Sequence, residues 1–121
     1  MKFVIKTTNL KLDREFSQYI EEKLNSLEKF SEIFQTKKYF NGFYKKGKSK
    51  VEAWVEIGKT SKHHQKGKVF WVECQLRFPG RSIRSIAQSE DLRVAINEVK
   101  DELQRELKYF KNKLSSKIKR R

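Results

Sequence analysis

Residues 85–114 read SIAQSEDLRVAINEVKDELQRELKYFKNKL, and this stretch is the most informative part of the sequence. The end of a short strand, from Ser85 to Gln88, leads into one long amphipathic helix, for which Asp91 is the expected N-cap. Beyond this cap the apolar residues recur at steps of three and four, the spacing of one continuous helical stripe. Such a stripe has to be buried, so the sequence predicts a packed domain. The stripe consists of Leu92, Ile96, Val99, Leu103, Leu107, Phe110 and Leu114.

The polar residues of the same helix are sorted by charge. One row beside the stripe contains no acid, whereas the acids turn to the other flank. A helix whose charges serve only solubility mixes them into pairs four residues apart. The sorting therefore predicts a basic polar face on one side of the domain. The row is Arg93, Asn97, Lys100, Gln104, Lys108 and Lys111, and the acids are Glu98, Asp101, Glu102 and Glu106.

The composition narrows the class of partner. The chain has 121 residues, and 29 Lys and Arg outnumber 15 Asp and Glu, for a net charge of +14. This excess favours a polyanion partner, with nucleic acid ahead of an anionic membrane. No apolar run is long enough to span a bilayer, and the start, MKFVIKTTNL, is too short an apolar patch for a signal peptide. Because Cys74 is the single cysteine, no disulfide framework exists, and we expect a cytoplasmic protein.

The periodicity along the rest of the chain predicts a β-α-β-β-β-α order. Strands are expected at 2–7, 51–57, 69–78 and 81–88, and a first helix at 13–31, capped by Asp13. Lys23 lies close to the apolar seam of that helix. The fold class is α+β: a two-layer sandwich with two helices packed on one face of a four-stranded sheet. We expect a single domain over 1–114, in which 32–50 is an insertion, and a basic, fraying tail at 115–121.

The opposite face of the predicted sheet carries Trp54 and Trp71. These rings could stack on bases, as in sheet-based RNA-binding domains. However, the alternation of the strands places Glu52, Glu56 and Glu73 on the same surface, where they would repel phosphate. A capping role or a protein contact is therefore favoured for the two tryptophans.

No motif supports an enzyme, a metal site or a cofactor. His63 and His64 are adjacent on a loop and lack the spaced partners that zinc coordination requires. A nuclease using one of them as a general base is the remaining catalytic hypothesis. The aromatic and lysine-rich segment at 32–50, with Tyr39 to Tyr44, fits equally an RNA-facing loop and a solvated insertion.

The run from Ile83 to Asn97 resembles the strand-to-helix signature of the ribosome hibernation-promoting factor and ribosome-associated translation inhibitor family. Small residues at 85 and 87, Asp91 at the helix start and the triplet 95–97 carry the likeness. Residues 19–29 resemble the family's first helix. Position 93, commonly aromatic in that family, is Arg here. We expect no second domain after the tail, so the chain resembles the short form, which lacks the part used to pair ribosomes.

The resemblance implies a fold similar to double-stranded RNA-binding domains and a binding site on the small ribosomal subunit. Family members occupy the mRNA channel over the A and P sites and silence translation in starved or stationary cells. We therefore expect a monomeric, non-enzymatic inhibitor that contacts ribosomal RNA, without a small-molecule substrate or a membrane partner. The alternative is a general structured-RNA-binding or RNA-chaperone module. The candidate contacts are Lys23, Arg84, Lys100, Lys108, Lys111 and Lys113, with Arg105 resting on the resemblance alone.

Overall fold

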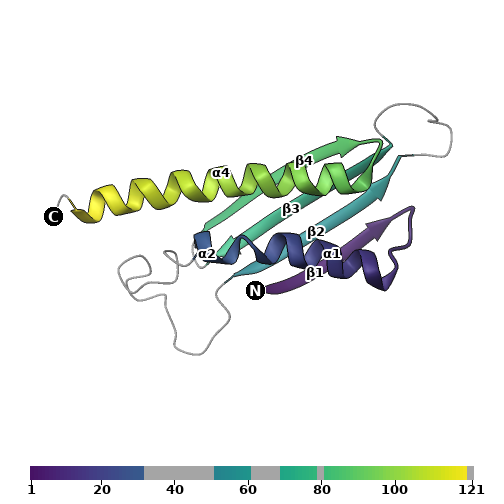
Figure 1. Cartoon of the computed structure of the whole chain (residues 1–121), viewed down its shortest axis with the longest axis horizontal. Coiled ribbons are helices and arrows are strands. Elements are labelled where there is room, and N and C mark those ends of the chain that lie inside the picture. Colours follow the sequence, from purple (N-terminus) through teal and green to yellow (C-terminus); the bar gives the residue numbers. More distant parts are fainter. Residues whose placement is uncertain (32–50, 61–68, 79–80, 120–121) are drawn as a thin grey trace.

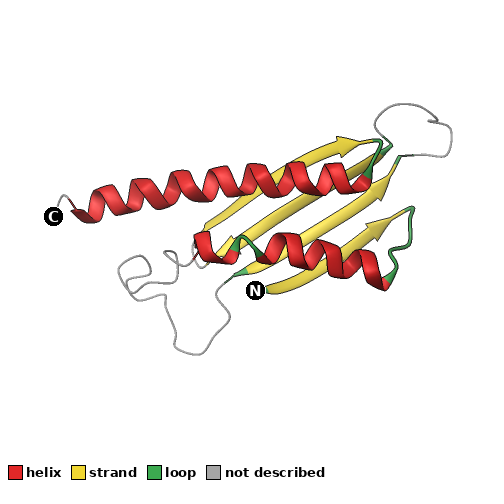
Figure 2. Ribbon diagram, in the orientation of Figure 1, coloured by secondary structure: helices red, strands yellow, loops and turns green. Residues whose placement is uncertain are grey.

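The sheet and its covering helices are described from a computed structural model, over residues 1–31, 51–60, 69–78 and 81–119. For residues 31 and 114–119 only the backbone is considered. The elements follow the predicted order (Figures 1 and 2). They are β1 (Lys2–Thr8), α1 (Arg14–Asn25), α2 (Glu28–Ser31), β2 (Glu52–Lys59), β3 (Phe70–Phe78), β4 (Arg81–Ser89) and α4 (Leu92–Lys119).

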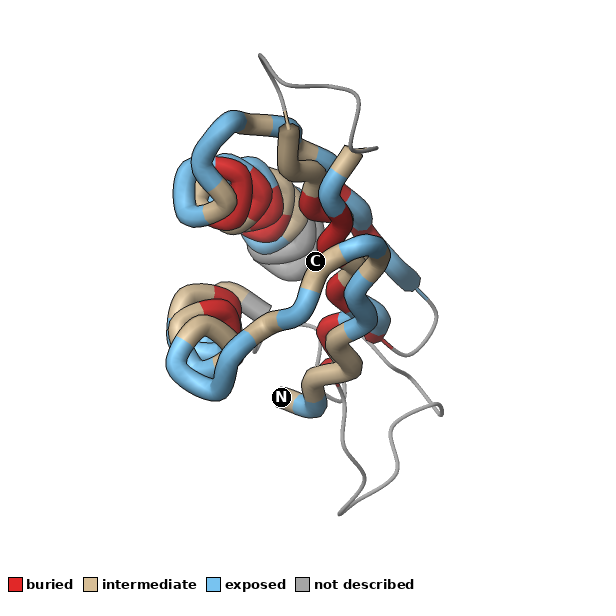
Figure 3. Tube along the Cα trace, turned by 90° about the vertical axis from the view of Figure 1, so that its right-hand side faces the viewer, coloured by how far each residue is buried: buried red, intermediate tan, exposed pale blue. Residues whose placement is uncertain are grey.

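The four strands form one mixed sheet in the order β1-β2-β3-β4. β1 pairs with β2 in parallel, whereas β2, β3 and β4 pair in antiparallel fashion. Viewed along the long axis, α1 and α4 lie on the same side of this sheet (Figure 3). The α+β two-layer sandwich is therefore confirmed, and none of the helices in the described residues lies on the second face of the sheet.

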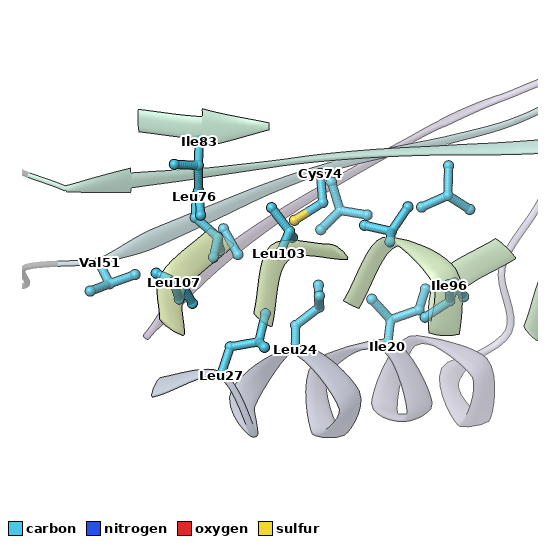
Figure 4. Close-up of a cluster of buried hydrophobic side chains, with 14 of the residues drawn as sticks. Ile20, Leu24, Leu27, Val51, Cys74, Leu76, Ile83, Ile96, Leu103 and Leu107 are labelled. Carbon is cyan, nitrogen blue, oxygen red and sulfur yellow. The ribbon is translucent and has the colours of Figure 1, made fainter. Parts of the chain in front are cut away.

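The core lies between that sheet and the two helices (Figure 4). Leu24 of α1 and Leu103 of α4 point toward the sheet, where they meet Cys74 and Leu76. All four side chains are at most 2% exposed. The positions that face the core are thus those that the sequence predicts. They are the alternating apolar residues of β2 and β3 and the apolar stripe of α4. Burial, with a smaller effect of Glu73, raises the pKa of the Cys74 thiol to about 12, so this thiol is a packing group.

The segment 13–31 differs from the single helix expected. Asp13 caps α1 as predicted, because its Oδ1 accepts a hydrogen bond of 2.7 Å from the Phe16 amide. The helix ends at Asn25, and the hydroxyl of Ser26 donates to the Lys23 carbonyl at 2.6 Å. The Leu27 amide then bonds to the Leu24 carbonyl, a tighter spacing than that of an α-helix. This turn lets Leu27 reach the core, where it is fully buried.

α4 continues beyond Leu114, where a frayed tail was expected, as far as Lys119. The reason is local: residues 115–119 contain neither Gly nor Pro, and the two lysines among them are good helix formers. A helix of 28 residues is about 42 Å long, whereas the nine residues of β4 span about 30 Å. The end of α4 therefore projects past the sheet (Figure 1).

Candidate nucleic-acid interface

The helices α1 and α4 are joined along their outer surface by a polar contact between Tyr19 and Asn97. The Tyr19 hydroxyl donates to the Asn97 side-chain carbonyl at 3.1 Å. Asn97 belongs to the acid-free row of α4, so this bond shows which neighbour the row faces. The row lies along the α1 side of α4, above the line where the two helices meet.

Cations from α1, α2 and α4 lie close to two aromatic rings along this junction. The Arg93 guanidinium lies 5.5 Å and the Lys23 ammonium 5.6 Å from the centre of the Tyr19 ring. Further along, the ammonium groups of Lys108 and Lys29 lie 5.2 and 5.0 Å from the Phe30 ring. At such distances the ring faces attract the cations and hold them in place. We call this surface the basic helical face, and it comprises Lys23, Lys29, Arg93, Lys100, Lys108 and Lys111.

Lys100 and Lys111 join this face in different ways. The Lys100 side chain is only 23% exposed, and its ammonium lies 3.5 Å from Asp101 on the same helix. Such a pair contributes little to stability, and it offsets part of the Lys100 charge. Lys111 is exposed and lies three residues beyond Lys108, so helical geometry keeps both on one side.

The charge changes sign along the groove between the helices. At the N-terminal ends of α1 and α4, a shallow hollow of about 270 Å³ is lined by Asp13, Glu15, Glu22 and Arg93. Carboxylates there would repel phosphate. The cations free to meet a polyanion therefore lie toward the C-terminal half of α4, near Lys108 and Lys111.

The structure separates three of the predicted contact residues from the basic helical face. Arg84 lies on the opposite side of the sheet, where its guanidinium is 3.4 Å from Glu73 of β3. Arg105 is exposed on the outer flank of α4, beside Asp101 and Glu102. Lys113 falls two helical turns after Glu106, on the flank that carries the acids. Lys23, Lys100, Lys108 and Lys111 are the candidates that the fold brings together.

Two basic residues outside that prediction point to the helical side. Lys29 lies on α2, which the sequence merged into a single helix. Arg81 shares the alternation of Ile83 and Ser85, both buried beneath the helices, and its guanidinium lies 4.1 Å from the Phe110 ring. The same alternation turns Arg84 away, so strand parity was the signal that could have distinguished the two arginines.

The described residues offer little for catalysis or metal binding. Within them, no group of three or more His, Cys, Asp or Glu side chains could hold a metal ion. None of the helices in that part of the chain is long and apolar enough to cross a bilayer. His63 and His64, and the aromatic segment from Tyr39 to Tyr44, lie outside the described residues.

An α+β sandwich whose helical layer gathers cations along one seam belongs to the class of basic binding domains. The sequence profile of the Sigma 54 modulation protein / S30EA ribosomal protein family matches residues 3–115, and the chain belongs to this family. The family consists of ribosome-associated modulation factors and not of enzymes. The resemblance of the 83–97 run to ribosome hibernation factors is thereby confirmed.

Two solved structures have a similar fold. The N-terminal domain of Protein Y from Thermus thermophilus superposes with a TM-score of 0.66 at 21% sequence identity, covering 91% of this chain and 99% of that one. A ribosomal subunit interface protein from Coxiella burnetii gives a TM-score of 0.64 at 14% identity, covering 93% and 99%. No curated protein matches the sequence at a significant level.

Proposed function

We propose that this protein binds the small ribosomal subunit in its decoding region and blocks translation by occupying the mRNA channel over the A and P sites. The contact surface is the basic helical face, whose cations neutralise phosphates of ribosomal RNA. The observation that carries the proposal is the gathering of Lys23, Lys108 and Lys111 along the α1–α4 seam in a member of a ribosome-associated family.

The form of the surface favours recognition of structured RNA by shape. The cations project from two rigid helices that are tied together by the Tyr19–Asn97 hydrogen bond, so their spacing is fixed before binding. Paired RNA shows little of its base sequence to side chains and is recognised mainly through phosphates and hydroxyl groups. Translation would stop because the domain fills the channel, without any chemical step. The protein acts as a monomer in the cytoplasm, and its partner there is the ribosome.

The alternative function is that of a general structured-RNA-binding or RNA-chaperone module, which the same basic face would serve. The two functions differ in how they respond to competing RNA. A general module binds any duplex of sufficient length, whereas a decoding-region inhibitor requires the assembled small subunit.

The test is sedimentation of the purified protein with small and large ribosomal subunits over a series of salt concentrations, with duplex RNA as competitor. We expect saturable, near-stoichiometric binding to the small subunit that survives an excess of duplex. Messenger RNA loaded in the channel should reduce this binding. If the duplex strips the protein from the subunit, the general RNA-binding function replaces the proposed one.

A further inference from the structure

Arg81 opens β4 and lies against the C-terminal half of α4. The strand and the helix run in opposite directions, so the start of β4 lies beside the later turns of α4 (Figure 1). The Arg81 guanidinium is 4.1 Å from the centre of the Phe110 ring. At this distance the ring attracts the cation, and a flat guanidinium can stack on it. Arg81 is therefore held in place although its side chain is exposed.

This contact lies on the flank of α4 that faces β4, away from the seam with α1. Lys113 follows Phe110 by three residues, so the two are neighbours on the helix surface. Lys108, which belongs to the basic helical face, precedes Lys113 by five residues and is turned from it by about 140° around the helix axis. The C-terminal half of α4 thus carries cations on both flanks, with Lys108 and Lys111 on one and Arg81 and Lys113 on the other.

The acids of α4 end before this region. Residues 107–121 contain neither Asp nor Glu. Glu106 and Glu102 lie about one and two helical turns before Phe110. In the part of the chain that the structure describes, neither of them forms an ion pair with Arg81. The charge of Arg81 is therefore available to a partner.

Two acids of other elements lie at the same end of the domain, and each of them has a cation beside it. Glu28 of α2 is 3.3 Å from the Met1 amino group. Glu52 lies at the start of β2, 3.8 Å from the Lys2 ammonium. These pairs offset the two carboxylates, so the field around this half of α4 is positive on both flanks.

We propose that Arg81 binds a phosphate of the RNA that contacts the basic helical face, so that the RNA interface continues across α4 to its β4 side. The inference rests on the proposed function, because the same RNA is the partner in both. A helix with its side chains is about 10–12 Å across, so cations on its two flanks meet two separate stretches of RNA backbone. The end of α4 then lies in a groove of structured RNA, which is recognised through its shape and its phosphates.

Phe110 is the positioning residue in this arrangement. Its ring holds the Arg81 guanidinium before RNA arrives, so that less side-chain freedom is lost on binding. The ring itself contacts no RNA, because the guanidinium lies over it.

The experiment compares Arg81→Gln with its matched control, Arg84→Gln. The two arginines are three residues apart on β4, and each change removes one positive charge. Arg84, however, lies on the opposite side of the sheet, 3.4 Å from Glu73. Filter binding is measured over a series of salt concentrations with small subunits and, separately, with an RNA duplex of about 16 base pairs. Arg81→Gln should lower affinity about eightfold at about 0.1 M salt and flatten the salt slope by about 0.9, whereas Arg84→Gln should match the wild type.

Phe110→Leu tests the positioning role, since it retains an apolar side chain and removes the ring. The salt slope should stay unchanged because Arg81 still meets its phosphate. Affinity should fall about threefold because the arginine has to be ordered on binding. In an Arg81→Gln background, Phe110→Leu should have no further effect. A loss in both backgrounds would show that Phe110 acts only through the fold.

The outcomes separate this inference from the proposed function. A wild-type slope and affinity in Arg81→Gln would overturn the inference, and so would an equal loss in Arg84→Gln, which would show that net charge alone governs binding. The proposed function fails by a different result, in which duplex RNA strips the protein from the small subunit. In that case the two arginine variants should still differ on the duplex, and equal binding there would overturn the inference as well.

Discussion

Neutralising two lysines at the exposed end of the basic helical face should weaken ribosome binding without unfolding the protein. Lys108 and Lys111 are both exposed, and neither forms an ion pair with a described acid. Replacement by Gln retains most of the length of each side chain and its helix propensity. Lys108 loses only a contact with the Phe30 ring at 5.2 Å. The free energy of unfolding should therefore change by less than about 0.5 kcal/mol.

The effect on binding follows from counterion release. Each phosphate contact in a duplex contributes a slope of about 0.9 to the dependence of log K on log salt concentration. Losing two contacts should thus flatten the slope by about 1.8 and lower affinity about 60-fold at about 0.1 M salt. At about 0.3 M salt the same loss shrinks to about ninefold, because each released ion gains less entropy in a more concentrated salt solution.

The assay is sedimentation or filter binding with purified small subunits at four or more salt concentrations. The matched control is the double variant Lys11→Gln with Lys59→Gln, which has the same net charge but alters exposed lysines at the other end of the sheet. Its slope should equal that of the wild type. An equal loss of affinity in both double variants would mean that net charge, and not this surface, governs binding. An unchanged slope in the Lys108 and Lys111 variant would remove these lysines from the interface.

Three further substitutions test the fold. Leu103→Ala removes a fully buried side chain from the centre of the core and should cost about 2–5 kcal/mol in urea unfolding. Gly58→Ala would place a Cβ 2.2 Å from the Trp71 ring; since this ring can swing outward, we expect a loss of about 1–2 kcal/mol and a red-shifted indole emission. Burial, and secondarily the charge of Glu102, raises the pKa of Glu106, so the proton is held more tightly in the folded state and stability falls as pH rises above the unfolded pKa. Glu106→Gln should therefore raise the urea midpoint at pH 7 and leave it unchanged in acid, where both side chains are neutral; a lower midpoint at pH 7 would contradict this.

The layers of the fold could be predicted because each element carries its own periodicity. The α4 stripe and the alternation of β2 and β3 identify the buried side of each element before any neighbour is known. The break after Asn25 could not be found in this way, because it depends on the Ser26 hydroxyl competing for a backbone carbonyl. The extension of α4 past Leu114 was missed for a different reason: the apolar pattern ends there, but nothing in the sequence stops the helix.

The candidate site was predictable only in part. Periodicity assigned the cations of α4 to one row, but it could not show that this row faces Tyr19 and Phe30, since that depends on how α1 and α2 pack. Arg84 was grouped with the helical lysines because of its charge, although strand alternation already placed it on the other face. The charge of a residue indicates its class of partner, whereas its side of the sheet decides which partner it can reach.

The parallel pairing of β1 with β2 has a consequence for how the chain folds. β2, β3 and β4 follow one another in the chain and can pair as soon as each is available. In contrast, β1 can pair with β2 only when the long intervening segment, residues 9–51, closes into a loop. Closing a longer segment costs more chain entropy before any contact forms. β1 should therefore join the sheet last, although it precedes the other strands in the chain. In pulse-labelled hydrogen exchange, the β1 amides should become protected after those of β3. A nascent chain would keep the apolar side of β1 exposed until its partner strand has emerged, which is when a chaperone could act on it.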